Sequence, residues 1–455
     1  MSKKFFETIK TRVKAISTIC LGVFIALTIA GFAESPAKTD EIGRPASDYK
    51  SSVPLAWFKL QLKLVKESSG FSPPVASRAF GYSGIAVYEA VVPGIPTHQS
   101  LAGQLNGLTT LPQCNSNKEY HWPTVANAAL ASVTKRLFAN VTGENMVAIE
   151  ALEKQFADQF KSALSQEMFD RSLAQGGVLA DAIYTWSLTD GGHEAYLKNF
   201  PDTYTPPVGS GLWGVPAPPA FTRALQPYWG NNRPFVLASR SECQPGPHTS
   251  YSEQSGSAFN VEAMEVFNTV KNITPEQRTI AEFWADDPSI TSTPPGHSIS
   301  ILNQIIEQKD LTLDIAAEAY ARVGMAVADA FISCFYTKYQ YNLLRPITYI
   351  NLLIAPNWQP LLITPPFPEY TSGHSVQSGA TAQVMTDMFG KVAFTDHTHD
   401  SLGLAPRSFE SFFEAADEAA ISRLYGGVHF RAAIEKGVTQ GKCIGQKVSA
   451  LRFRK

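Results

Sequence analysis

Apolar residues recur along most of the chain at intervals of three and four positions, the spacing that places them on one face of an α-helix. Strand-like alternation of apolar and polar residues is nearly absent. We therefore predict an all-α protein built of helical bundles. The helices predicted in the first half of the chain are Ala56–Lys66, Val75–Val91, Trp122–Leu137 and the long helical run Asn145–Thr189.

Residues 201–250 interrupt this pattern, because they hold ten of the chain's thirty prolines. Such a density favours a long irregular connection over a helix. A flexible linker is one interpretation, but the aromatic residues of the stretch favour packing against the helices. These are Trp213, Phe221, Tyr228, Trp229 and Phe235. We predict helical regions at 34–200 and 256–455, joined by a Pro/Gly-rich connection at 201–255.

Helical periodicity resumes after the connection. The pattern predicts helices at Phe259–Asn272, Pro275–Trp284 and Leu313–Leu344, the last of them ended by Pro346. Seven residues are close to two helical turns, so Lys338 and Arg345 should project from the long helix in the same direction, about 10 Å apart. Such a pair usually marks a solvated face. Phe331 and Phe335 on the same face favour a buried role instead.

The first 33 residues have the pattern of an export signal. Five Lys and Arg residues precede an apolar run from Ile16 to Ile29, and Gly31-Phe32-Ala33 offers a small-x-small cleavage site. The run is shorter than the roughly 20 residues that a spanning helix needs, which favours cleavage after Ala33 over an uncleaved membrane anchor. We predict an exported protein, periplasmic or secreted, with no stable membrane span after cleavage.

Charge and cysteine content narrow the function classes. The full chain has a formal net charge of −2, and 33 basic and 39 acidic residues remain without residues 1–33. This acidic balance speaks against nucleic-acid binding. The four remaining cysteines are too widely spaced for a zinc site or a disulfide framework. An exported protein could pair Cys114 with Cys243, which the sequence leaves open.

Three short stretches contain what a multiply charged oxyanion needs, namely fixed cations, histidines and a glycine-bearing helix start. They are KYQYNLLRP with Lys338 and Arg345, PEYTSGHS with Ser372, Gly373 and His374, and SRLYGGVH with Arg423 and His429.

The second and third stretches lie at predicted helix ends. A helix that begins near Ser375 would place Ser372, Gly373 and His374 at its N-terminus, where free backbone N–H groups favour an anion. The alternative for Ser372 is a simple N-cap. A predicted helix at 409–424 ends within the third stretch, and a turn at Gly426-Gly427 before a helix that begins near Val428 could bring Arg423 and His429 into one pocket. The alternative for such a histidine is a structural role.

Taken in order, the three stretches resemble the signature of the superfamily that unites type 2 phosphatidic acid phosphatases with vanadium-dependent haloperoxidases. That signature is Lys-x6-Arg-Pro, then Ser-Gly-His, then Ser-Arg-x5-His, and the chain has all three parts at 338–346, 372–374 and 422–429. The similarity to the haloperoxidase branch extends through EFWADDPSITSTPP, which begins at Glu282, and covers roughly residues 280–435. The resemblance implies the helical bundles of that superfamily.

The resemblance also implies a vanadate cofactor and the residues that bind it. Lys338, Arg345 and Arg423 would bind the equatorial oxygens. Ser372 and Gly373 would donate further hydrogen bonds to the anion.

The remaining implied roles are catalytic. His429 would ligate vanadium, and His374 would be the acid–base group. Asp287 resembles the supporting carboxylate, and Lys338 would also polarise the bound oxidant. The implied activity is a vanadate-dependent haloperoxidase that oxidises halide with hydrogen peroxide to hypohalous acid.

Two alternatives remain open at this point. One is an acid phosphatase of the same superfamily, in which His429 attacks the phosphorus of a phosphate ester and His374 protonates the leaving alcohol. The other is a catalytically silent oxyanion-binding protein, because Ala433 stands where the superfamily usually has an Asp four residues after the last histidine. His429 then needs another acceptor to orient it. Phe367, where some bromoperoxidases carry histidine, leans toward the chloroperoxidase-like branch.

Two further motifs carry weaker predictions. His397-Thr398-His399-Asp400 could bind a divalent metal, but a surface loop is favoured without further ligands. Asn140-Val141-Thr142 and Asn272-Ile273-Thr274 are glycosylation sequons where the host glycosylates exported proteins. Neither the halide nor the oligomeric state follows from the sequence.

Overall fold

The structure is a computed structural model that describes residues 43–214 and 222–455, all of which belong to one compact unit. The predicted export signal and Phe221 lie outside the described residues. Helices dominate this unit, and the prediction of an all-α fold is confirmed. The division into helical regions at 34–200 and 256–455 stays a prediction.

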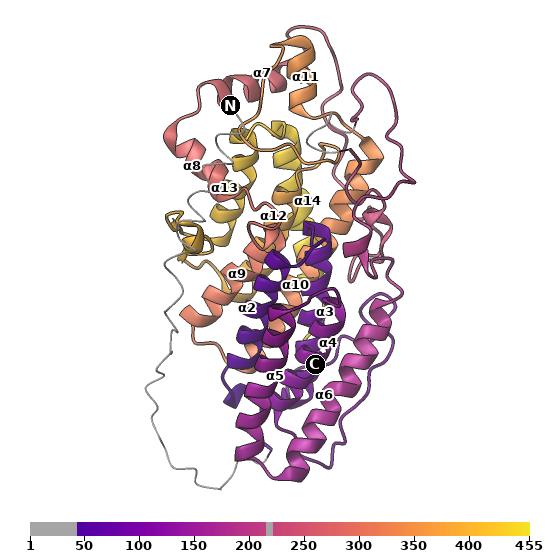
Figure 1. The fold of residues 1–455 in the computed structure, drawn as a ribbon, viewed down its shortest axis with the longest axis vertical. Helices are drawn as coiled ribbons and strands as arrows, with labels where there is room; N and C mark the ends of the chain where they lie inside the picture. Colours follow the sequence, from indigo (N-terminus) through magenta and orange to yellow (C-terminus); the bar gives the residue numbers. More distant parts are fainter. Residues whose placement is uncertain (1–42, 215–221) are drawn as a thin grey trace. The chain divides into compact units, whose positions relative to one another are not determined.

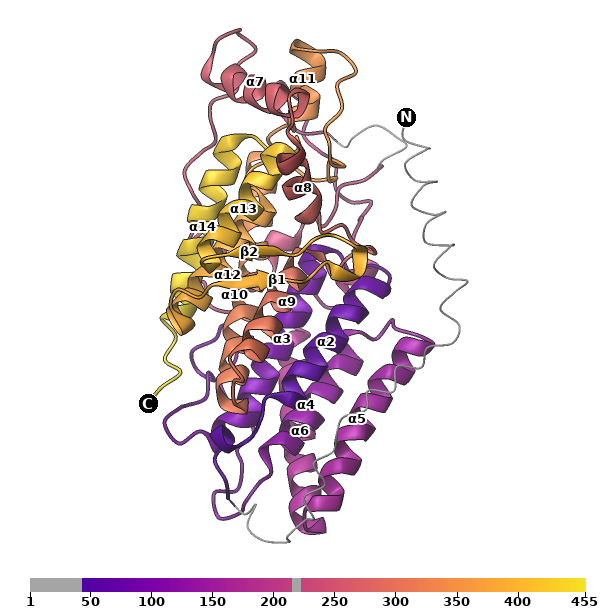
Figure 2. The same ribbon diagram turned by 90° about the vertical axis from the view of Figure 1, so that its left-hand side faces the viewer.

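The helices of the first half occupy the indigo-to-magenta part of the ribbon in Figures 1 and 2. They are α2 (Ser52–Glu67), α3 (Pro73–Val91), α4 (Trp122–Leu137), α5 (Glu144–Ala163) and α6 (Gln166–Ser187), with short 3-10 turns η1 (Ala46–Asp48), η2 (Val92–Gly94) and η3 (Ala195–Leu197). The run predicted at Asn145–Thr189 is two helices. It divides because Leu164 is extended and the Ser165 side chain caps α6 by accepting a hydrogen bond from the Met168 N–H.

The second half contributes a second set of helices. They are α7 (Ala258–Lys271), α8 (Pro275–Phe283), α9 (Thr293–Gln308), α10 (Leu313–Tyr341), α11 (Pro346–Leu353), α12 (Gly373–Phe389), α13 (Phe412–Tyr425) and α14 (Arg431–Ser449). A short antiparallel pair, β1 (Phe394–Asp396) and β2 (Arg407–Phe409), is the one sheet within 43–214 and 222–455. Helix α9 was not predicted, because its first turn contains two prolines, which the first turn of a helix tolerates.

Helix α10 ends earlier than predicted. Asn342 adopts the left-handed conformation with φ of 46°, and its N–H bonds back to the Lys338 carbonyl. Asparagine is among the few residues that adopt this conformation readily, so it ends the helix before Pro346 can. Arg345 is therefore the N-cap residue of α11. The prediction that a single helix carries Lys338 and Arg345 is wrong.

Helices α3 and α10 pack closely along their length (Figures 1 and 2). A Cβ atom on Gly84 of α3 would lie 2.3 Å from the Tyr320 carbonyl oxygen, and one on Gly324 of α10 would lie 2.6 Å from the Phe80 carbonyl oxygen. Only glycine permits so close an approach of two helix backbones. The helix that carries Lys338 is thereby fixed against the first half of the chain.

Helices α12 and α14 pack in the same manner. A Cβ atom on Gly441 of α14 would lie 2.1 Å from the Val376 carbonyl oxygen. At the start of both helices, the Ser372 N–H donates to the Ala433 carbonyl over 3.1 Å. This packing brings the beginning of α12 next to the segment that precedes α14, where His429 lies.

The Pro-rich connection is irregular as predicted, apart from the 3-10 turn η4 (Trp229–Asn231). Trp213, Trp229 and Phe235 are buried, whereas Tyr228 is exposed. Asp329 of α10 accepts hydrogen bonds from three consecutive N–H groups of residues 235–237, at 2.6, 2.9 and 3.1 Å. The packed interpretation of the connection, rather than the flexible linker, is therefore correct for its described residues.

A disulfide bond joins Cys243 of the connection to Cys443 of α14. The pairing of Cys114 with Cys243, left open by the sequence, is wrong. Cys114 and Cys334 are free. The true partner, Cys443, lies 200 residues away in the chain and is brought near by the packing of α14.

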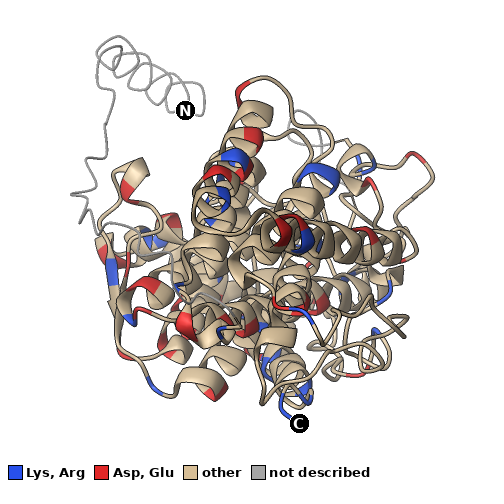
Figure 3. Cartoon of the chain, turned by 90° about the horizontal axis from the view of Figure 1, so that it is seen from below, with Lys and Arg blue, Asp and Glu red and all other residues tan. Residues whose placement is uncertain are grey.

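No helix in the described part of the chain is both long and apolar enough to cross a bilayer. In the view of Figure 3, Lys and Arg segments are interspersed with Asp and Glu segments. The predictions of export and of no nucleic-acid partner stay predictions.

Candidate active site

Lys338 and Arg345 converge on the loop before α12, although they come from two helices. Both side chains are fully buried. The Lys338 Nζ donates to the carbonyls of Pro368 and Glu369 at 3.1 and 2.9 Å, and the Arg345 Nε donates to the carbonyl of Phe367 at 2.9 Å. Both cations also lie over the Phe367 ring, 5.0 and 4.9 Å from its centre. The loop thus holds two cationic groups in one buried region.

Arg423 adds a third buried cation from the last turn of α13. Its Nη1 donates to the Trp284 carbonyl at 2.9 Å. Burial lowers the pKa of Lys338 to about 7 and the pKa values of Arg345 and Arg423 to about 10. Burial disfavours the charged form of each group, and a bound anion would reverse that effect.

His429 lies between a carboxylate and a guanidinium group. Its Nδ1 is 2.9 Å from Glu369 Oε1, and its Nε2 is 3.1 Å from Arg345 Nη1. A carboxylate accepts and a guanidinium donates, so we infer that Nδ1 carries the proton and Nε2 has the lone pair. Burial, then the charge of Arg345, lowers the pKa of His429 well below its usual value. The ring is therefore neutral and its Nε2 can bind a metal.

Glu369 is the hydrogen-bond acceptor that orients His429. Such an acceptor is needed because position 433 is Ala, where the superfamily usually has an Asp. Glu369 is fully buried, and its Oε1 also accepts the Phe430 N–H at 2.8 Å. Sequence reasoning did not identify Glu369, although it lies three residues before Ser372 in the PEYTSGHS stretch. The signal that could have found it was an acidic residue in a stretch already assigned to the site.

The N-terminus of α12 supplies the next part of the site. Ser372 is its N-cap, with Oγ accepting the Ser375 N–H at 3.3 Å, so the helix begins two residues earlier than predicted. Gly373 is the first helical residue, and a Cβ atom there would have its nearest neighbour, Phe331, 3.9 Å away. The backbone at Gly373 therefore faces open space at the positive end of a helix.

A cavity of about 430 Å³ lies over these groups. Of the predicted site residues, its lining includes Gly373, His374, Arg423, His429 and Asp287. Phe331, Phe335, Phe367, Leu225 and Ile363 are among the residues of its apolar wall. Lys338, Arg345 and Ser372 are buried and contribute no surface to it.

His374 is close to Asp286, the residue before the predicted supporting carboxylate Asp287. Its Nε2 lies 3.9 Å from Asp286 Oδ2, and its ring donates a hydrogen bond to the Trp284 carbonyl. Burial, then the charge of Arg423, lowers the pKa of His374 well below its usual value. Asp287 interacts electrostatically with Arg423, while burial raises the pKa of its carboxyl.

Asp286 belongs to a buried cluster with two further histidines. His297 Nδ1 lies 2.9 Å from Asp286 Oδ2, and His399 Nε2 lies 3.1 Å from Asp286 Oδ1. The interpretation of 397–400 as a surface loop is wrong for His399, which is buried. It is correct for His397, which is exposed and pairs with Asp400. Sequence reasoning missed His297, because its partners come from distant segments.

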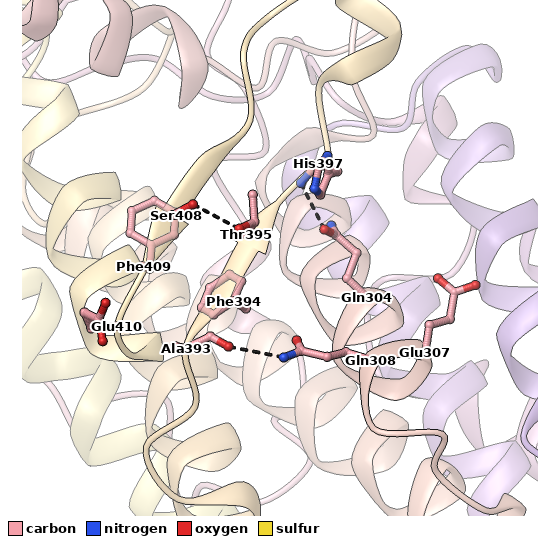
Figure 4. Close-up of a pocket in the computed structure, with 10 residues that line it drawn as sticks. All are labelled: Gln304, Glu307, Gln308, Ala393, Phe394, Thr395, His397, Ser408, Phe409 and Glu410. Atoms are coloured by element: carbon pink, nitrogen blue, oxygen red, sulfur yellow. Dashed lines mark hydrogen bonds between the residues drawn. The ribbon is translucent and has the colours of Figure 1, made fainter.

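A wider groove of about 660 Å³ lies between α9 and the β1–β2 pair (Figure 4). It shares no lining residue with the cavity over His429. Its polar groups already bond to one another: the His397 N–H donates to Gln304 at 2.9 Å, and Gln308 donates to the Ala393 carbonyl at 3.3 Å. The buried cations and the helix N-terminus place the candidate active site in the smaller cavity.

Comparisons with known proteins identify the family of the chain. The family model of the VCPO second helical-bundle domain matches residues 352–454. The crystal structure of a bacterial vanadium-dependent iodoperoxidase is 38% identical in sequence and superimposes with a TM-score of 0.80, over 89% of this chain and 97% of that one. This chain belongs to the vanadium-dependent haloperoxidase family.

Two further relatives extend the comparison within the haloperoxidase family. The vanadium chloroperoxidase of Curvularia inaequalis is 26% identical over 229 residues, and the match spans 37% of this chain and 37% of that protein. The holo-type structure of a bacterial vanadium-dependent chloroperoxidase shares the fold, with a TM-score of 0.66 and 16% identity over 86% of this chain and 95% of that one.

Proposed function

We propose that this protein is a vanadate-dependent haloperoxidase that uses hydrogen peroxide to oxidise a halide to hypohalous acid. The observation that carries the proposal is a neutral His429 whose Nε2 lone pair lies among buried cations, with Glu369 fixing the proton on Nδ1. Family membership supports it. The 38% identity to an iodoperoxidase makes iodide the first halide to test.

The buried polar atoms fit a tetrahedral oxyanion. Arg345 Nη2, Arg423 Nε and His374 Nε2 have no hydrogen-bond partner among the described residues. Burying a polar group without a partner is costly, and more so for a charged one. Bound vanadate would satisfy these groups together with the N–H groups at the start of α12. It would supply a Lewis acid that keeps its oxidation state.

Each predicted site residue then has a defined role. Lys338, Arg345 and Arg423 would hold the oxygens of the anion, and His429 Nε2 would ligate the vanadium. His374 Nε2, neutral and without a partner among the described residues, accepts and returns protons. Asp287 balances the charge of Arg423.

The apolar wall of the cavity lies beside the charged and polar residues that would bind the anion. Phe331, Phe335 and Phe367 line the cavity beside the cationic groups and limit the access of water to them. A drier site strengthens every electrostatic contact with the anion. This effect should favour retention of the cofactor.

The test loads the purified protein with vanadate and measures vanadium content together with iodide, bromide and chloride oxidation. Hydrolysis of a phosphate ester is measured on the vanadate-free protein. We expect halide oxidation that depends on vanadate and is lost in His429→Ala. The matched control is His397→Ala, since His397 is exposed and lies outside the cavity. Ester hydrolysis without halide oxidation would assign the phosphatase activity instead, and neither activity would leave an oxyanion-binding protein.

A further inference from the structure

The cluster around Asp286 connects two cavities. Asp286 lines the active-site cavity, whereas His399 lines an adjoining cleft of about 280 Å³, with Ile290 common to the walls of both. That cleft is formed by residues of α2, including Lys63 and Lys66, and by the loops at 290–292 and 398–402. Since His399 Nε2 lies 3.1 Å from Asp286 Oδ1, the two side chains bridge the protein between the cavities.

Asp286 is placed to pass a proton onward to His374. Its Oδ2 lies 3.9 Å from His374 Nε2, and this nitrogen has no hydrogen-bond partner within the described residues. A movement of roughly 1 Å brings such a pair to hydrogen-bond distance. His399, Asp286 and His374 therefore lie in sequence as groups that can accept and release a proton, with contacts of 3.1 and 3.9 Å that small movements would close.

His297 has a different task, because both of its ring nitrogens face carboxylates. Nδ1 lies 2.9 Å from Asp286 and Nε2 lies 2.7 Å from Asp396. Burial would lower the pKa of His297, but the two carboxylates outweigh it and raise the pKa to about 10. The imidazolium fixes the orientation of Asp286 and lowers the pKa of its carboxyl, so that a proton taken from His399 would be passed on and not retained.

We propose that His399 and Asp286 are a proton path from the cleft beside α2 to His374. The proposal rests on the proposed function, because halide oxidation consumes a proton in every turnover. One halide ion, one hydrogen peroxide and one proton give one hypohalous acid and one water. The halide loses two electrons, the O–O bond breaks, one oxygen bonds to the halogen, and the other leaves as water with the added proton.

The apolar lining of the active-site cavity explains why a separate proton path would be needed. The active-site cavity is walled largely by apolar and aromatic side chains, which are poor carriers of protons. Peroxide and halide can enter through that cavity, while protons reach His374 through Asp286 from the cleft that His399 lines. His399 and Asp286 would thus act through His374 and would not touch the reacting atoms.

The decisive variants are His399→Gln and His399→Ala. Glutamine keeps a polar side chain beside Asp286 but cannot relay a proton, and alanine opens a space next to the cleft that free imidazole can enter. We expect both variants to lower kcat above neutral pH by about 10- to 100-fold. This is the usual effect of removing a residue that supports a histidine of the active site. Vanadium content and the KM for peroxide should be unchanged, and imidazole should restore His399→Ala. His397→Ala, two residues away and exposed, is the matched control.

A second measurement needs neither vanadate nor turnover. In vanadate-free protein with 15N-labelled histidine, proton exchange at the His374 ring should slow in both His399 variants and recover with imidazole in His399→Ala.

Unchanged exchange and unchanged kcat would overturn the proposal. So would a divalent metal bound in equal molar amount by the wild type and lost in His399→Ala, since Asp286, His297 and His399 would then be metal ligands. If the wild type oxidises no halide, the proposed function fails, and the exchange measurement still decides whether the path exists.

Discussion

Glu369 Oε1 lies 2.9 Å from His429 Nδ1 in a buried contact. This contact joins the loop before α12 to the segment before α14. We expect Glu369→Gln to weaken vanadate binding by about 10- to 100-fold, because an amide holds the imidazole less firmly and lowers its basicity. Vanadate affinity is measured by equilibrium dialysis. Glu435→Gln on the exposed face of α14 is the control and should bind as the wild type does. Equal affinity in Glu369→Gln would remove Glu369 from the site.

Arg345 and Arg423 should each contribute a charge-assisted hydrogen bond to the anion. We expect replacement of either by alanine to weaken vanadate or phosphate binding by about 1.5–3 kcal/mol. Isothermal titration with each anion measures the loss. Arg240→Ala, which removes a partly exposed cation over Tyr336, should leave the affinity unchanged. Wild-type affinity in both active-site variants would mean that the anion binds elsewhere.

His374 and His429 should fail in different ways. His374→Ala should keep its vanadium and lose turnover by about 100-fold or more, as expected for an acid–base group. His429→Ala should lose the metal itself. The comparison uses vanadium content and halide oxidation at matched protein concentration. Equal retention of vanadium in the two variants would contradict this division of tasks.

Anion affinity should fall as the pH rises above about 7. Burial lowers the pKa of Lys338 to about 7 without an anion, so above this pH a binding anion must first restore a proton to Lys338. The loss approaches about tenfold in affinity for each pH unit. Sulfate is the probe, since it does not titrate in this range.

Lys338→Arg separates this effect from that of a neighbouring carboxyl. Burial raises the pKa of Glu369 to about 7, and its ionisation would weaken anion binding in the same direction. Arginine stays charged throughout the range, so the variant should lose only the part of the slope that belongs to Lys338. A slope identical to that of the wild type would assign the whole effect to Glu369.

The cluster around His297 should make stability decline at alkaline pH. The pKa of His297 is about 10 in the folded protein and about 6.5 when unfolded, so its contribution is complete below pH 6.5 and is lost as the pH rises to about 10. The expected slope is about 1.4 kcal/mol for each pH unit in that window. Denaturant unfolding at several pH values measures it, and His297→Gln should lack the slope. Asp286 and Asp396, whose pKa values are lowered, contribute in the opposite sense, at acidic pH.

What the sequence could predict was local in the chain. Lys338, Arg345, Ser372, Gly373, Arg423 and His429 stand in short stretches with recognisable spacing, and the structure brings all of them to one buried region. Helix periodicity located most helices to within a few residues. It missed α9, where a pair of prolines opens the helix, and the short helix α11. It also extended α10 past Asn342, whose left-handed conformation leaves no trace in periodicity.

What it could not predict depends on packing between distant segments. Glu369 meets His429 across 60 residues, and His297 meets Asp396 across 99. The same holds for Cys443, which bonds to Cys243 across 200 residues of the chain. The partner of a buried carboxylate or thiol depends on which residues pack next to it in space. The spacing of residues along the chain does not reveal those neighbours.

The disulfide between Cys243 and Cys443 also bears on how the chain would withstand proteolysis. Residues 253–256 form an exposed segment after Cys243, of the kind that proteases cleave. A cut there would separate Lys338 and the rest of the site from the first half of the chain in sequence, yet the two fragments would remain covalently joined through α14. They would also remain packed together through α3 and α10. The nicked protein would migrate as one species without reductant and as two with it, and the two-fragment form should retain the complete active site.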